Sequence, residues 1–117
     1  MPLHSDQFNI FTGTIPAGGS LSQVIDTTGY DLQGLGLVQN GTAALVAGTI
    51  QFRVGWEPGT LYPLNDGANV RVGIPHGTGS AAYSFVAVQA IRPYRYVQIE
   101  TSANQTNGAQ VKIPVKL

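Results

Sequence analysis

The stretch IQFRVGWE, residues 50–57, decides the fold of this chain. Its large apolar side chains stand at every second position, and polar, charged or small residues stand between them. Successive side chains of a β-strand point to opposite faces, so this alternation places the apolar groups on one face. We therefore predict a half-buried strand whose core-facing residues are Ile50, Phe52, Val54 and Trp56.

The same alternation recurs along the chain, and no segment shows a comparable period of 3.6 residues. Gly, Pro, Asn and Asp separate the alternating segments about every 8–12 residues, a spacing typical of a β-sandwich or jelly roll. We predict an all-β fold, a single-domain antiparallel β-sandwich that is jelly-roll-like, with about eight or nine strands. The predicted strands cover residues 7–15, 21–25, 32–38, 45–54, 61–64, 68–74, 82–88, 96–101 and 110–117.

One β-sandwich domain is expected to span residues 1–117, with a short polar N-terminal arm at residues 1–7 and a flexible Gly-rich loop at 75–80. Pro114 favours an edge position or a strand end for the last strand, because proline cannot donate to a sheet. The predicted core consists of Phe8, Ile10, Leu21, Leu35, Leu37, Ile50, Phe52, Val54, Val70, Val72, Phe85, Val97, Ile99, Val111, Ile113 and Val115.

The low charge of the chain limits its partners. Charged residues make up 10% of the sequence, and six basic residues balance six acidic ones. A net charge of zero offers no electrostatic attraction to nucleic acid or to an anionic membrane, so we expect neither as a partner. Free soluble domains usually keep their net charge away from zero, so this surface favours a protein that stays docked on another. A weakly charged secreted or bacterial domain is the alternative.

Cysteine is absent, which excludes disulfides, thiolate chemistry and zinc sites built on thiolates. The first residues lack the basic and apolar regions of a secretory signal, and no apolar run approaches the ~18 residues of a membrane span. We expect synthesis in a bacterial cytoplasm without export.

Catalytic groups are few. His4 and His76 stand outside any spaced cluster of ligands, so we expect solvated loop histidines rather than a metal site. No pattern pairs two carboxylates for glycoside hydrolysis, and no G-x-S-x-G motif is present. The Gly-Thr-Gly-Ser loop at 77–80 lacks the lysine and the helix of a phosphate loop. We expect no enzyme activity, cofactor or metal.

The aromatic residues are candidates for recognition. Trp56, Tyr62, Tyr83, Tyr94 and Tyr96 could line a sugar-binding face by stacking. The phase of Trp56 within its strand instead favours a place in the core or at its rim.

A cluster of arginine and tyrosine at residues 92–96 is equally compatible with a protein interface and with a corner that covers the end of the core. Arginine and tyrosine are enriched at protein–protein hot spots. The candidate protein-interface residues are Phe8, Phe11, Trp56, Tyr62, Arg92, Tyr94, Arg95 and Tyr96.

Short motifs follow one another in a recognisable order, at residues 15–22, 24–26, 30–35, 50–62, 64–67, 95–102 and 111–115. This order resembles that of the small virion structural proteins of tailed bacteriophages, and the resemblance covers most of residues 14–117. The turn after the central strand departs from the family pattern: Gly-Trp-Glu-Pro-Gly, residues 55–59, stands where a Ser-x-Asp-Gly turn is expected.

The resemblance implies a non-enzymatic jelly roll that decorates or cements the outer surface of a phage capsid. Its partner would be the major capsid protein, and a homo-oligomer, with a trimer favoured, would suit the symmetry axes of a capsid. The alternative is a carbohydrate- or receptor-binding β-sandwich of a tail fibre or a cell-surface protein, which would use exposed Trp56 and tyrosines. Head and tail locations both stay open.

Overall fold

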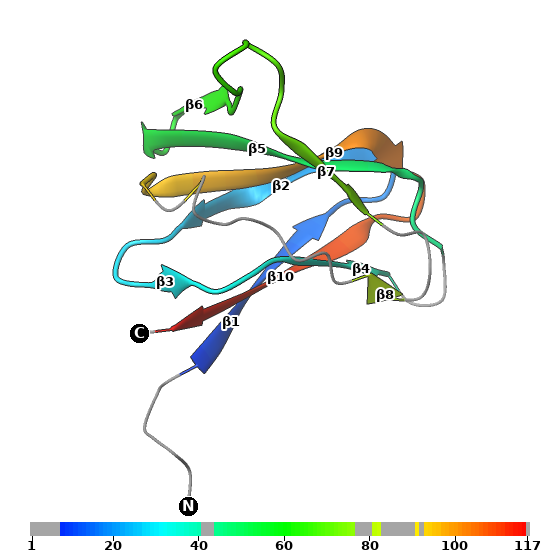
Figure 1. The fold of residues 1–117 in the computed structure, drawn as a ribbon. Helices are drawn as coiled ribbons and strands as arrows, with labels where there is room; N and C mark the ends of the chain where they lie inside the picture. Colours follow the sequence, from blue (N-terminus) through cyan, green and yellow to red (C-terminus); the bar gives the residue numbers. More distant parts are fainter. Residues whose placement is uncertain (1–7, 41–43, 77–80, 83–90, 92, 117) are drawn as a thin grey trace, which may run out of the picture.

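A computed structural model describes residues 8–40, 44–76, 81–82, 91 and 93–116. All regular elements among these residues are β-strands (Figure 1). Several sequence predictions lie outside the described residues: the arm at 1–7, most of the strand at 82–88 with Tyr83 and Phe85, Arg92, and the side chain of Phe8.

The strands form two antiparallel sheets that pack face to face (Figure 1). The first sheet has the order β1 (Phe8–Ile15), β10 (Ala109–Lys116), β4 (Gly36–Gln39) and β8 (Ala81–Ala82), and β3 (Asp31–Leu32) also pairs with β10. The second sheet has the order β2 (Gly19–Asp26), β9 (Tyr96–Gln105), β5 (Gly48–Glu57) and β6 (Thr60–Pro63), and β7 (Gly73–His76) also pairs with β5.

The chain passes repeatedly from one sheet to the other, so most neighbours within a sheet are far apart in sequence. The first strand β1 pairs with the last strand β10, and β2 pairs with β9. This is the strand order of a jelly roll, and the predicted β-sandwich is confirmed. Strand β1 lies at one edge of the first sheet, and β2 lies at one edge of the second sheet. The two strands contact one another, so together they form one side of the sandwich.

Pro114 lies inside the first sheet, so the prediction of an edge position or a strand end is wrong. It pairs with Ile10 on one side, and its carbonyl accepts a hydrogen bond from the Gln33 amide on the other at 2.8 Å. The neighbouring strand on that second side is interrupted between β3 and β4. Because the missing N–H of proline faces this interruption, the central strand loses no ladder partner there.

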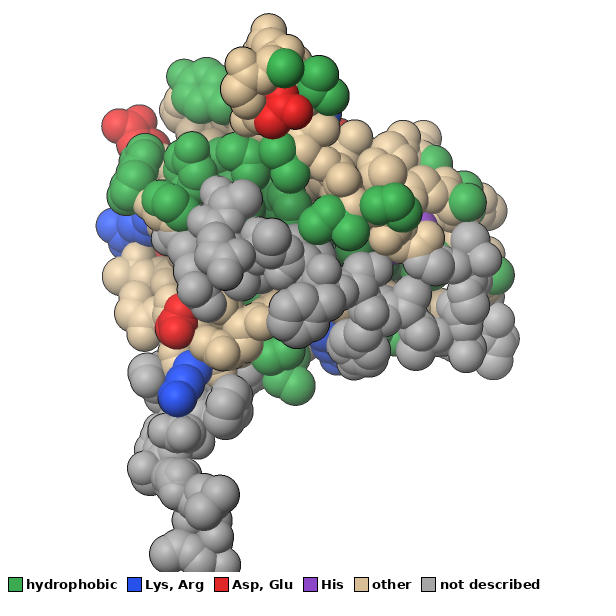
Figure 2. All heavy atoms as spheres, in the orientation of Figure 1, with side chains coloured by type: hydrophobic (Ala, Val, Ile, Leu, Met, Phe, Trp, Pro, Cys, Tyr) green, Lys and Arg blue, Asp and Glu red, His purple; other side chains and the backbone are tan. Residues whose placement is uncertain are grey.

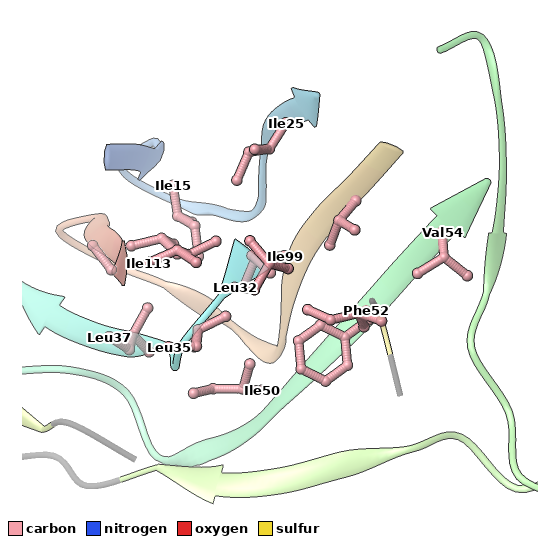
Figure 3. Close-up of a cluster of buried hydrophobic side chains, with 14 of the residues drawn as sticks. Ile15, Ile25, Leu32, Leu35, Leu37, Ile50, Phe52, Val54, Ile99 and Ile113 are labelled. Carbon is pink, nitrogen blue, oxygen red and sulfur yellow. The ribbon is translucent and has the colours of Figure 1, made fainter. Parts of the chain in front are cut away.

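The core fills the space between the sheets. Figure 3 shows Phe52 and Ile99 of the second sheet and Leu32 and Ile113 of the first within one buried cluster. The confirmed core residues are Leu35, Leu37, Ile50, Phe52, Val54, Val97, Ile99, Val111, Ile113 and Val115, with Val72 partly buried against them. Residues that the sequence prediction missed are Ile15, Ile25, Leu32, Leu45, Ile91 and Ala109.

In the edge strands β1 and β2, the residues that face the core differ from those predicted. In β1 the residues that face the core are Phe11 and Ile15, so Ile10 is 57% exposed. In β2 a shift of register between Leu21 and Val24 leaves these two residues 39% and 38% exposed. A change of phase by one residue moves every side chain of a strand to the opposite face, so the core predictions for Ile10 and Leu21 are wrong.

Val70 is 59% exposed, so its predicted place in a buried strand is also wrong. The carboxylate of Asp66 accepts hydrogen bonds from the backbone amides of Ala68 and Val70, at 2.8 and 3.0 Å. Asn69 takes a φ of 65°, which closes this loop. Short polar side chains that bond their own backbone compete with strand pairing, and β7 begins only at Gly73.

His76 lies in β7, opposite Gly48 of β5, and its side chain is buried. The expectation of a solvated loop histidine is therefore wrong at this position, because the strand runs further than the Gly-rich sequence suggested. His4 lies outside the described residues.

Candidate functional site: the cleft of the β5–β6 hairpin

A β-bulge sets the geometry of the β5–β6 hairpin. Val54 pairs with Tyr62 and Glu57 pairs with Thr60, so three steps along β5 match two along β6. The extra residue interrupts the alternation that runs from Ile50 to Val54. Trp56 therefore leaves the core-facing phase and is 65% exposed, which overturns its predicted place in the core or at its rim.

Gly55 permits this bulge. A Cβ at position 55 would run into the carbonyl oxygen of Thr60 and would lie 3.0 Å from the side chain of Leu61. The strands can approach this closely only because glycine has no side chain. The Arg53 guanidinium also donates to the Leu61 carbonyl at 3.3 Å, which further fixes the backbone of β6.

We expect Gly55→Ala to destabilise the protein by about 1–3 kcal/mol, because the Thr60 carbonyl belongs to the backbone and the hairpin must shift to make room. Gly59→Ala is the matched control: its added Cβ meets nothing within 4 Å, so its effect should stay within about 0.5 kcal/mol. Urea unfolding of both variants measures the difference. Equal stability of the two variants would contradict the close approach at Gly55.

The two strands of the hairpin border a small, open surface cleft of about 270 Å³, lined by Trp56, Glu57, Thr60 and Tyr62. Tyr62 is 64% exposed, so both aromatic side chains of the cleft are largely accessible to solvent. Figure 2 shows hydrophobic side chains gathering over the end of the molecule where Figure 1 places β6 and the end of β5. The cleft combines two rings with one carboxylate and one hydroxyl.

Tyr94 supports Trp56 without lining the cleft. The two ring centroids lie 5.9 Å apart and the planes are tilted by 48°, within the range of favourable aromatic contacts. Tyr94 is itself half-buried against the core, and its amide donates to the Ile91 carbonyl at 3.1 Å. The Trp56 ring is thus held in place by a residue anchored in the core.

The corner that carries Arg95 is built into the end of β2. Thr27 donates its hydroxyl to the carbonyls of Tyr94 and Arg95, at 3.1 and 3.0 Å. The Arg95 guanidinium lies 3.4 Å from the Asp26 carboxylate and 5.0 Å from the centre of the Tyr96 ring. These residues have partners within the chain, which gives the corner a structural role.

The carboxylate of Asp26 makes the stability of the protein depend on pH. The hydroxyl and the amide of Thr28 donate to its carboxylate at 2.6 and 3.0 Å, and with the nearby Arg95 they lower its pKa from 3.8 to about 2. A carboxyl group with a lowered folded-state pKa stabilises the fold above its unfolded-state pKa. This stabilisation is lost as the pH falls from about 4 to about 2.

We therefore expect Asp26→Asn to flatten the loss of stability between pH 4 and pH 2, with little effect on the shape of the curve above pH 5. Thr28→Val should raise the pKa of Asp26 towards 3.8, because its hydroxyl is the largest cause of the shift. Urea midpoints across this pH range and an NMR titration of the Asp26 carboxyl group check the two expectations. An Asp26 that titrates near 3.8 in the unchanged protein would refute both.

Five of the candidate interface residues lie in two adjoining groups. Trp56, Tyr62 and Tyr94 come together at the hairpin. Arg95 and Tyr96 belong to the corner, which adjoins the hairpin because Tyr96 pairs with Gly55 of β5. Phe11 is half-buried and meets Tyr30 edge-on at 4.7 Å. Arg92 and the side chain of Phe8 lie outside the described residues.

Glu57 and Thr60 are cleft residues that the sequence reasoning did not select. A signal was available: Pro58-Gly59 predicts a tight turn, and the residues that flank such a turn face each other across the hairpin. The observed pairing of Glu57 with Thr60 follows this rule.

Within the part of the chain that the structure describes, no three His, Asp or Glu side chains converge as a metal-binding group. Among the same residues, no helix has the length and hydropathy needed to cross a membrane.

Comparison of the chain with family models, with curated proteins and with solved structures finds no match in any of the three. Its function therefore has to be inferred from its own residues and geometry.

Proposed function

We propose that this protein is a non-enzymatic structural protein of a bacteriophage virion, which binds the outer surface of the capsid as a decoration or cement protein. The order of its sequence motifs supports this proposal, and a jelly roll is a fold found in viral capsid proteins. Since a fold does not determine a function, the surface of the molecule has to carry the argument.

The observation that carries the proposal is a set of exposed apolar side chains on the side of the sandwich formed by β1 and β2. Ile10 lies on β1, and Leu21 and Val24 lie on β2. Exposed apolar side chains on these two strands give this side of the domain apolar surface that a partner could bury. The residues at 1–7, which precede β1 in the chain, are the second contact that we propose.

The charges of the chain are also suited to docking. Asp26 pairs with Arg95, and Glu100 pairs with Arg71 on the second sheet. Opposite charges are thus partly neutralised within the chain, and a neutral surface costs less to desolvate against another protein than a charged one.

In this proposal the protein stabilises the capsid passively. Burial of apolar surface contributes about 25 cal/mol per Å², so one copy that buries a few side chains binds weakly. A closed cyclic homo-oligomer, for which we propose a trimer, would engage several capsid subunits at once, and linked contacts multiply the affinity. Light scattering of the free protein should then give the mass of three chains of 12.3 kDa each.

Mass spectrometry of purified virions tests the proposed location. The protein should be present in the particle, in a fixed ratio to the major capsid protein, and it should fractionate with heads rather than tails. Its absence from the particle would overturn the proposal.

A second candidate function is supported by the cleft of the β5–β6 hairpin. A carbohydrate- or receptor-binding module of a tail fibre or a cell-surface protein would use exposed aromatic side chains such as Trp56 and Tyr62. Fractionation with tails, or absence from virions together with binding to a host glycan, would favour this candidate.

A further inference from the structure

We propose that the cleft lined by Trp56, Glu57, Thr60 and Tyr62 binds one unit of an uncharged saccharide. This assignment goes beyond the structural role in the capsid, and it gives the second candidate function a defined site and a defined class of ligand. It uses a surface on β5 and β6, whereas the proposed capsid contact lies on β1 and β2, so either can fail without the other.

The aromatic rings supply the apolar half of the site. Trp56 and Tyr62 are 65% and 64% exposed, and both line the cleft. Large aromatic faces stabilise a ligand when an apolar face of that ligand covers them. The ring of a pyranose has C–H groups on one face and hydroxyl groups at its rim, so it can stack on an aromatic side chain while it keeps its polar groups accessible.

The polar residues of the cleft supply the hydrogen-bonding half of the site and determine which ligand it accepts. Glu57 and Thr60 pair across the hairpin and line the same cleft. Sugar hydroxyls can donate to the Glu57 carboxylate and can exchange hydrogen bonds with the Thr60 hydroxyl. A purely apolar ligand would leave the Glu57 carboxylate desolvated and unpaired, which is unfavourable. An acidic sugar would be repelled by the same carboxylate.

The shape of the cleft favours a saccharide over a cation. Cages for quaternary ammonium groups surround the ligand with ring faces. Here two rings line a cleft that is wide open to solvent, and the third ring, Tyr94, packs on Trp56 outside it. The volume of about 270 Å³ lies just below the ~300–1,000 Å³ typical of ligand sites, so the cleft has room for no more than one sugar unit.

The hairpin is organised before any ligand arrives. The bulge at Gly55 fixes the offset of the two strands, Arg53 holds the Leu61 carbonyl, and Tyr94 holds the Trp56 ring. A site whose residues are already in place loses little conformational entropy on binding. One sugar unit in such an open site should still bind with a Kd of about 1 mM, and many copies on one particle would raise the effective affinity.

The single tryptophan of the chain makes the test direct, because Trp56 lies in the cleft. A glycan array identifies a bound saccharide, and its methyl glycoside is then titrated against the purified protein while Trp56 fluorescence is recorded. We expect binding to a neutral glycan and a saturable fluorescence change at about millimolar concentration.

Variants inside and outside the cleft test whether the saccharide binds there. Trp56→Ala should abolish the array signal and Tyr62→Ala should weaken it at least about tenfold, and both side chains are exposed enough for the variants to fold. Val70→Ala, an exposed apolar position outside the cleft lining, should bind as the unchanged protein does.

Three outcomes would overturn the proposal: no glycan bound on the array, binding that survives Trp56→Ala, or binding restricted to acidic sugars. A fluorescence response to tetramethylammonium with none to any saccharide would reassign the cleft to a cation.

Discussion

Phe52→Ala is expected to lower the free energy of unfolding by about 3–5 kcal/mol, the largest effect of any substitution considered for this chain. Phe52 is 1% exposed and is the largest fully buried side chain among the residues that the structure describes. It faces the core from β5, which pairs with β9, β6 and β7. A domain of this length has a total stability of about 6–18 kcal/mol, so the variant should lose a substantial part of it.

Urea unfolding followed by far-ultraviolet circular dichroism measures this loss. Phe52→Leu keeps most of the apolar volume and should lose clearly less than the alanine variant. Val70→Ala is the control from a position with the same sequence pattern but an exposed side chain, and its effect should stay within about 0.5 kcal/mol. Similar losses at positions 52 and 70 would show that the core has been assigned wrongly.

Gln105→Leu is expected to lower the free energy of unfolding by about 2–4 kcal/mol, because it leaves two backbone groups without partners. The side-chain oxygen of Gln105 accepts from the Val46 amide at 2.8 Å, and its nitrogen donates to the Val46 carbonyl at 3.0 Å. Gln105 is almost completely buried, so water cannot replace these bonds at the glutamine. The side chain ties the segment before β5 to the end of β9.

Gln23→Leu is the matched control. Gln23 also bonds backbone groups with both ends of its amide, at Thr14 N and Thr12 O, but it is exposed to solvent. Water can take its place, so the loss should stay below about 1 kcal/mol. Hydrogen exchange adds a local readout: the Val46 amide should exchange at least about tenfold faster in Gln105→Leu than in the unchanged protein. Unchanged protection of Val46 would contradict the role given to Gln105.

The alternating pattern of β5 was sufficient to predict the fold class. Ile50, Phe52 and Val54 lie in the core as predicted, because a strand buried on one face imposes its period on the sequence. The pattern failed at Trp56, where an extra residue in the strand changes the phase. A bulge depends on how two strands fit together, and a single-strand period carries no information about it.

The failures at Ile10 and Val70 have different physical causes. In β1, apolar residues occupy both faces, so the sequence did not distinguish the core face of Phe11 from the exposed face of Ile10. At Val70, the turn built by Asp66 overrides the strand preference of the valine. Local hydrogen bonds and pairing partners decided these positions, and the apolar pattern did not.

The candidate site was predictable only in part. The aromatic residues Trp56, Tyr62 and Tyr94 were selected from composition, yet their meeting at one hairpin required the fold. Gln105 was not predictable, since a glutamine between the predicted strands at 96–101 and 110–117 gave no sign of its nearly complete burial. The strand β9 extends to Gln105 and carries the side chain into the interior.

The central claim is that the side of the sandwich formed by β1 and β2 docks on a phage capsid. Three purified proteins test it by co-sedimentation with assembled shells that lack decoration: the unchanged protein, the double variant Leu21→Lys/Val24→Lys, and the control Ala68→Lys/Val70→Lys. Both control positions are exposed and lie between β6 and β7, and β6 and β2 stand at opposite ends of the strand order of the second sheet, so the control adds the same charge away from β1 and β2. Each substitution in the double variant places a charge where we expect an apolar contact, at a position that is already partly exposed.

The unchanged protein and the control should bind the shells saturably, at a fixed ratio to the capsid protein, and the double variant should bind at least about tenfold more weakly. Equal binding of all three proteins would exclude β1 and β2 as the contact. If the unchanged protein stays in the supernatant at every concentration, the proposed capsid role is wrong.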